Sequence, residues 1–211
     1  MPRDIHSEAI LQFALQAKWA RWLAAHHGQT EGVWLRHAKK GAPTATVSYT
    51  EALEVALCFG WIDSQKKAES EHFFIQRWSP RGARSIWSKV NRDKALGYIQ
   101  TGYMQPAGLA EIERARRDGR WDAAYDPASR SEIPADLQAA LDALPGTAEF
   151  FATVSAQNRY AVLFRLQTAK KPETRARRVA QFAQMLARGE TFYPHNPHNP
   201  NNPNNPRKTK A

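Results

Sequence analysis

The sequence holds a single cysteine, Cys58, in 211 residues, so a disulfide within the chain is excluded. It also lacks long apolar runs, since no stretch approaches the roughly 18 consecutive apolar residues that a membrane helix needs. The N-terminal residues include Arg3, Asp4 and Glu8 instead of the apolar core of a signal peptide. We therefore expect a cytoplasmic protein that does not insert into a membrane.

The signatures of common catalytic and metal sites are missing as well. The chain has no Gly-x-Gly-x-x-Gly, no P-loop and no His-Glu-x-x-His. Its histidines, among them His37 and His72, are scattered and have no cysteine pair beside them, which argues against zinc. Cys58 lies in an apolar run and is expected to be a buried structural residue rather than a nucleophile. We predict no metal, no cofactor and no identifiable catalytic residue, which favours a non-enzymatic protein without excluding an enzyme.

Basic residues outnumber acidic ones and give a net charge of +10. This balance points to anionic partners such as nucleic acid or a phosphorylated ligand, although excess charge can also serve solubility alone. Residues 77–94 hold six basic and one acidic side chain, and residues 165–188 hold seven and one. Residues 111–150 hold nine acids and five bases, so this segment could pair with the basic ones. No nucleic-acid-binding signature is present, so any such binding should be weak and salt-dependent.

Hydrophobic periodicity and capping signals predict an α+β fold that is predominantly helical and has a small β-sheet. Strands are predicted at residues 32–38 and 72–78. The segment between them should contain a helix and a loop, which allows either a parallel crossover or an antiparallel pair. The predicted N-caps are Ser7, Asn91 and Ser48, the last in a capping box with Glu51. The predicted helices are 8–26, 49–59, 91–100, 106–118, 134–144, 147–154, 156–168 and a last helix that opens at Pro172.

The composition predicts one compact domain over residues 1–194 and a disordered tail over residues 195–211. Hydrophobic residues make up 42% of the chain, which is enough for one sizeable core or two small ones. The tail repeats asparagine and proline, has no large apolar residue and ends in a short basic run. Such a segment cannot bury enough surface to fold, so its removal should not reduce stability.

Six short motifs point to a known family. They are 56–64 (ALCFGWIDS), 77–81 (RWSPR), 85–91 (SIWSKVN), 102–108 (GYMQPAG), 118–126 (DGRWDAAYD) and 169–175 (AKKPETR). In this order and spacing they resemble the bacterial YdeI/OmpD-associated family, also called bacteriocin-protection proteins, over about residues 8–193. The resemblance implies a stress-response role in tolerance to bacteriocins or cationic antimicrobial peptides, and it supplies no catalytic residues. The family name also implies association with an outer-membrane porin, which does not fit a cytoplasmic chain.

Residues 61–91 are the richest in binding chemistry. The candidate ligand-binding residues are Trp61, Asp63, Arg77, Arg81, Ser85, Trp87, Ser88 and Asn91. Arginine presents a planar fork to carboxylate or phosphate, tryptophan presents a flat face, and a helix N-terminus near Asn91 favours anions. The alternative is structural: the tryptophans are core residues, Asn91 only caps its helix, and Arg77 forms an ion pair with Asp63.

Three functions remain open at this stage. The first is a non-enzymatic protein of bacteriocin tolerance that binds an anionic small molecule or a protein partner. The second is an enzyme that acts on an anionic small molecule at residues 61–91, and the third is nonspecific nucleic-acid binding. Because a chain of charge +10 repels cationic peptides, we expect an indirect role rather than sequestration. Replacing Arg77 and Arg81 with alanine should then abolish tolerance and leave the fold intact.

Overall fold

The computed structural model describes residues 9–194, which belong to two separately packed units. The N-terminal unit ends at Ala124, and the C-terminal unit begins at Tyr125. Each unit has its own cluster of buried apolar side chains. The single domain predicted over residues 1–194 therefore contains two hydrophobic cores within the described residues.

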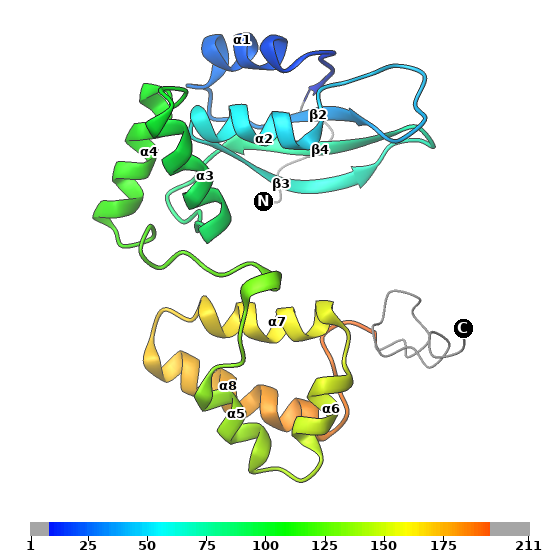
Figure 1. Ribbon diagram of the computed structural model, residues 1–211, viewed down its shortest axis with the longest axis vertical. Helices are drawn as coiled ribbons and strands as arrows, with labels where there is room; N and C mark the ends of the chain where they lie inside the picture. Colours follow the sequence, from blue (N-terminus) through cyan, green and yellow to red (C-terminus); the bar gives the residue numbers. More distant parts are fainter. Residues whose placement is uncertain (1–8, 195–211) are drawn as a thin grey trace. The chain divides into compact units, whose positions relative to one another are not determined.

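The N-terminal unit combines helices with a four-stranded sheet (Figure 1). In chain order its elements are β1 (Ile10–Leu11), α1 (Gln16–His26), β2 (Val33–Ala38), α2 (Tyr49–Cys58), β3 (Trp61–Ala68), β4 (Phe73–Pro80), α3 (Lys89–Gln100) and α4 (Pro106–Arg117). The strands lie in the order β1-β2-β4-β3. The β1–β2 pair is parallel, and the other neighbouring pairs are antiparallel.

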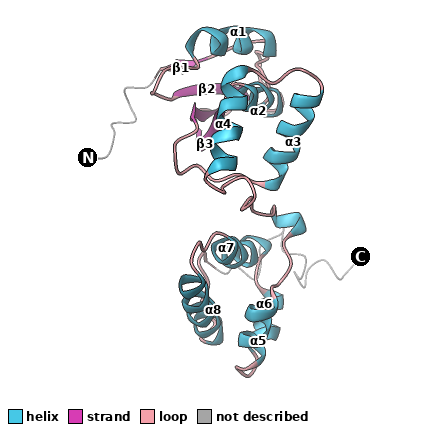
Figure 2. Cartoon of the chain, turned by 90° about the vertical axis from the view of Figure 1, so that its left-hand side faces the viewer, coloured by secondary structure: helices cyan, strands magenta, loops and turns pink. Residues whose placement is uncertain are grey.

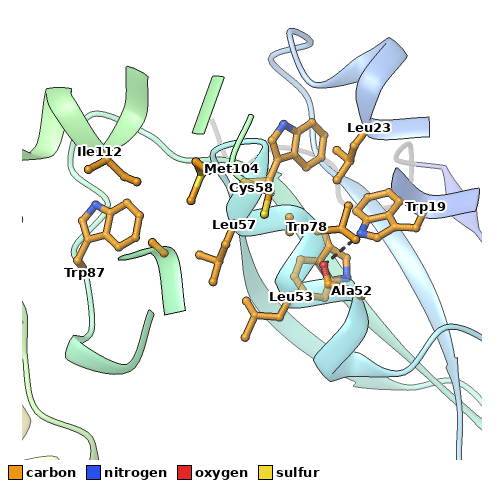
Figure 3. Packing of buried hydrophobic residues seen from close by; sticks show 14 of the residues in the cluster. Trp19, Leu23, Ala52, Leu53, Leu57, Cys58, Trp78, Trp87, Met104 and Ile112 are labelled. Atoms are coloured by element: carbon orange, nitrogen blue, oxygen red, sulfur yellow. Dashed lines mark hydrogen bonds between the residues drawn. The ribbon is translucent and has the colours of Figure 1, made fainter. Parts of the chain in front are cut away.

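Helices α1 and α2 pack on one face of this sheet (Figure 1). Buried aromatic side chains join the two layers. The indole Nε1 of Trp19 in α1 donates to the carbonyl oxygen of Ala52 in α2 at 3.2 Å (Figure 3). The ring centroid of Trp19 lies 6.4 Å from that of Trp61 in β3 and 6.3 Å from that of Trp78 in β4. All three indoles are fully buried, so this cluster fixes both helices to the sheet.

The C-terminal unit is built from short helices around a separate core (Figure 2). Its elements are a 3₁₀ turn (Ala128–Arg130), α5 (Ala135–Asp142), α6 (Thr147–Thr153), α7 (Ala156–Gln167) and α8 (Pro172–Ala187). Each α-helix contributes buried apolar side chains to this core, among them Leu141, Phe151, Leu166 and Phe182. Within residues 9–194, every helix is too short or too polar to cross a membrane.

Most of the predicted elements are confirmed, and so is the α+β class with its small sheet. The two predicted strands are β2 and β4, and their pairing is antiparallel. The capping box of α2 forms as predicted, with Ser48 accepting from the backbone N–H of Glu51 at 3.2 Å. The predicted N-cap Ser7 and the predicted tail at residues 195–211 lie outside the described residues.

Three local predictions are wrong. The first helix starts at Gln16 rather than residue 8, because Ile10 and Leu11 pair with β2 as strand β1. The loop predicted after α2 is strand β3, which pairs with β4. The N-cap of α3 is Ser88, whose hydroxyl accepts from the backbone N–H of Asn91 at 3.1 Å. Asn91 therefore lies inside the first turn of the helix that it was expected to cap.

Candidate functional site

Three of the predicted ligand-binding residues meet in the segment between β4 and α3. The guanidinium Cζ of Arg81 lies 3.7 Å from the ring centroid of Trp87. The Nη1 of Arg81 donates to the Ser85 hydroxyl at 3.3 Å and to the Ile86 carbonyl oxygen at 3.2 Å. Arg81 is 4% exposed and Trp87 is 1% exposed. Both side chains are therefore used inside the fold and present little surface to a ligand from solvent.

Three further predicted residues also have structural partners. Trp61 is fully buried, and its indole Nε1 donates to the carbonyl oxygen of His27 at 3.0 Å. Ser88 and Asn91 form the N-terminal cap of α3. Trp61 is therefore a core residue of the N-terminal unit, as the structural interpretation of the tryptophans predicted.

Asp63 and Arg77 do not form the ion pair that the sequence allowed. Asp63 accepts from the Tyr49 hydroxyl at 3.0 Å and from Nε2 of Gln76 at 3.3 Å. It lies opposite Trp78 in the β3–β4 register. Because successive strand residues point to opposite faces, Arg77 lies on the other face of the sheet. The eight residues are thus spread over separate surroundings, and ligand binding by them stays a prediction.

A charge cluster that the sequence does not predict fixes α4 beside this segment. Arg120, only 6% exposed, donates from Nη1 to the carbonyl oxygen of Ser85 at 2.7 Å and lies 3.7 Å from Glu111. Arg114 donates to the Glu111 carboxylate at 2.6 Å and to the carbonyl oxygen of Arg81 at 2.8 Å. The buried guanidinium of Arg120 stabilises this packing, because removing one of its partners would leave a buried charge without compensation.

A groove of about 950 Å³ runs over α2 in the N-terminal unit. Its lining includes Val55 and Cys58 from α2 together with residues of α1 and α3. The residues from α1 and α3 include small ones, among them Ala17, Ala20 and Gly97. These small side chains leave the space between α1 and α3 open. A concave, mostly apolar cavity of this size is typical of a small-molecule site.

A few polar groups face this apolar groove. Nε2 of Gln16 donates to the Glu54 carboxylate at 3.2 Å. Burial, together with the negative charge of Glu54, raises the pKa of the Cys58 thiol to about 11. Burial and the same carboxylate raise the pKa of the Tyr98 hydroxyl to about 12. At neutral pH the groove therefore combines one carboxylate with a neutral thiol and a neutral phenol, and the exposed Arg21 lies at its edge.

The sequence contains a partial signal for this groove. Ala17, Ala20 and Ala24 recur at helical spacing, so they share one face of α1, and Glu54 interrupts the apolar run between Leu53 and Val55. Neither pattern shows which helices flank that face. No group of three or more His, Cys, Asp or Glu side chains in the described part of the chain is placed to hold a metal ion.

Comparison with known families separates the chain along the same lines as the structure. A family model described as bacteriocin-protection, YdeI or OmpD-associated matches residues 130–189. Residues 130–189 of the C-terminal unit are therefore similar to the YdeI/OmpD-associated family, and this matched segment is called the YdeI/OmpD-associated domain below. This match confirms the resemblance for residues 130–189, and bacteriocin protection is part of the description of the matched family. A second model, described as a domain of unknown function (DUF8412), matches residues 11–111. No curated protein and no solved structure matches the chain.

The six motifs on which the resemblance was based are distributed over both matched segments and the residues between them. The motif at residues 169–175 lies in the YdeI/OmpD-associated domain. The four motifs between residues 56 and 108 lie in the DUF8412 segment, and the motif at residues 118–126 lies between the two matches. Every residue that lines the groove over α2 also falls within the DUF8412 segment. The groove is therefore a feature of that segment and not of the YdeI/OmpD-associated domain.

Proposed function

We propose that this protein supports bacteriocin protection as a non-enzymatic binding protein in the cytoplasm, and that the groove over α2 holds a small molecule with an apolar body. The observation that carries the proposal is the groove itself. It has the volume of a ligand site, an apolar lining and a few inward polar groups. The YdeI/OmpD-associated domain at residues 130–189 supports the connection with bacteriocins.

The groove supports this ligand better than Arg77 and Arg81 support an anionic one. The Arg81 guanidinium is buried against Trp87 and bonded to its own loop, so a ligand would have to displace those contacts. The groove needs no such displacement, because small residues such as Ala20 and Gly97 already leave it open. The role in protection is indirect in this proposal, since the net charge of +10 disfavours capture of cationic peptides.

Binding of the neutral apolar dye Nile red tests the proposal. A Cβ built at Gly97 in α3 meets no atom within 4 Å, so Gly97→Leu should fold while its side chain fills the groove. Gln100→Leu adds the same side chain to an exposed position of α3 that does not line the groove. We expect saturable dye binding by the natural protein, at least about tenfold weaker binding by Gly97→Leu and unchanged binding by Gln100→Leu. Equal binding by both variants would rule out the groove as the site.

A further inference from the structure

Among the described residues that line the groove, Glu54 is the only acid. Its carboxylate is half-buried on α2 and accepts a hydrogen bond from Gln16. Within residues 9–194, Glu54 takes part in no ion pair. Glu111 differs in this respect, because it pairs with Arg114 at 2.6 Å. Glu54 is thus a carboxylate in an apolar groove that has hydrogen-bond donors beside it, Gln16 and Tyr98, but no ion pair among the described residues.

The neighbours of Glu54 do not remove its charge. The Cys58 thiol and the Tyr98 hydroxyl stay neutral at physiological pH, because burial and the Glu54 charge both raise the pKa of each group. Arg21 lines the edge of the groove, but it is exposed, so water screens its charge. A carboxylate in less polar surroundings interacts more strongly with a cation than a carboxylate on the surface does.

We propose that the groove over α2 selects a ligand that carries a primary ammonium group on an apolar body, with the ammonium bound to Glu54. This inference rests on the proposed function, because it names the chemistry of the ligand that the groove holds. A primary ammonium supplies three N–H donors, and charge-assisted hydrogen bonds to a carboxylate are roughly twice as strong as neutral ones. The apolar body lies against Ala17, Ala20 and Val55.

Three ligands with the same chain test this selectivity: octylamine, 1-octanol and octanoate, each titrated calorimetrically at neutral pH into the full chain. We expect octylamine to bind at least about tenfold more tightly than octanol, and octanoate to bind more weakly than octanol. Glu54→Gln keeps the size of the side chain and removes its charge, so it should abolish the preference for octylamine over octanol. Glu31→Gln is the control, because it removes the same charge from an exposed position that does not line the groove.

The outcomes separate this inference from the proposed function. Saturable Nile red binding with equal affinity for octylamine and octanol would overturn the ammonium inference and leave the groove as the site. Tightest binding of octanoate would also overturn it and would point to Arg21 as the selecting charge. If neither Nile red nor any of the three octyl compounds binds, the proposed function fails and this inference fails with it. A preference for octylamine that Glu54→Gln removes and Glu31→Gln retains would support both.

Discussion

The guanidinium of Arg81 lies 3.7 Å above the ring centroid of Trp87, and both residues are buried in the N-terminal unit. A cation–π contact without water between its partners is worth about 2 kcal/mol. The same guanidinium also donates to Ser85 and Ile86. The pair therefore belongs to the packing of the segment that follows β4, so the expectation from the sequence that alanine at position 81 leaves the fold undisturbed is revised.

Arg81→Ala is expected to lower the free energy of unfolding of the N-terminal unit by about 2–4 kcal/mol, because it removes this stacking and both hydrogen bonds. Arg84→Ala, at an exposed position of the same loop, should change it by no more than about 0.5 kcal/mol. Urea unfolding followed by far-ultraviolet circular dichroism measures both values. An Arg81→Ala protein as stable as Arg84→Ala would mean that the Arg81 contacts do not stabilise the fold and that its guanidinium could bind a ligand instead.

His37 predicts acid sensitivity of the same unit. It is 1% exposed, Nδ1 lies 2.9 Å from the Val47 carbonyl oxygen, and Nε2 has no hydrogen-bond partner among the described residues. Burial lowers the pKa of His37, and the charge of Lys66 lowers it further, while the bond to Val47 opposes the change. The unfolded chain therefore binds a proton at a higher pH than the folded chain does. The stabilisation is complete above the unfolded pKa of about 6.5 and is lost as the pH falls below it.

We expect the free energy of unfolding to decrease between about pH 6.5 and pH 5, with a slope from His37 that approaches 1.4 kcal/mol per pH unit. His37→Asn cannot take up this proton, so its stability should depend less on pH over the same interval, even though its absolute stability is lower. His72→Asn is the control, because His72 is exposed. Parallel pH profiles for the natural protein and His37→Asn would show that His37 does not cause the acid sensitivity.

The sequence predicts those parts of the fold that depend on local signals. The capping box of Ser48 and Glu51 involves residues three positions apart, and both of its hydrogen bonds form. Strand β3 was missed because Lys66 and Lys67 interrupt its pattern. These side chains lie over aromatic rings of other strands, with Lys66 over Phe74 in the neighbouring β4 and Lys67 over Trp34 in β2. Lysine on an edge strand is common, and it hides the strand from a search for alternating apolar residues.

In the candidate site, too, contacts between residues close in the sequence were predictable and contacts between distant residues were not. The grouping of Arg81, Ser85 and Trp87 was predictable, because these residues lie within seven positions of one another. The packing around them was not predictable, because it includes Arg120, which follows the C-terminal end of α4 and donates to the Ser85 carbonyl oxygen. The groove needs α1, α2 and α3 to take particular places in space, and single-sequence patterns do not contain that information. Glu54 can be identified as a candidate binding residue only when the positions of those three helices are known.

Leu141 tests whether the two hydrophobic cores unfold separately. It is fully buried in the core of the C-terminal unit, so Leu141→Ala should destabilise that unit by about 2–5 kcal/mol. All seven tryptophans precede residue 125 in the sequence, so their fluorescence reports on the N-terminal unit. We expect the circular dichroism transition of Leu141→Ala to begin at lower urea while the fluorescence midpoint stays in place. Leu57→Ala, in the core of the N-terminal unit, should shift the fluorescence midpoint instead. Coincident shifts in both signals for Leu141→Ala would mean that the chain unfolds as one cooperative body.

Gly108 brings the start of α4 against the end of α2, next to Cys58 and Met104. A Cβ at this position would lie 2.3 Å from the Cys58 carbonyl oxygen and 2.5 Å from the Met104 sulfur. Met104 can adjust, but the Cys58 carbonyl is backbone and also accepts from the Gln105 N–H at 3.2 Å.

Gly108→Ala therefore sets two effects of opposite sign against each other. Alanine favours a helix over glycine by about 1 kcal/mol. Overpacking against a rigid backbone atom costs about 1–3 kcal/mol, so we expect a net loss of stability. Gly97→Ala is the matched control, because a Cβ there meets no atom within 4 Å and only the gain in helix propensity remains. Urea unfolding should therefore place Gly97→Ala at or above the natural protein and Gly108→Ala below it. If Gly108→Ala were the more stable of the two variants, α4 could not lie this close to α2.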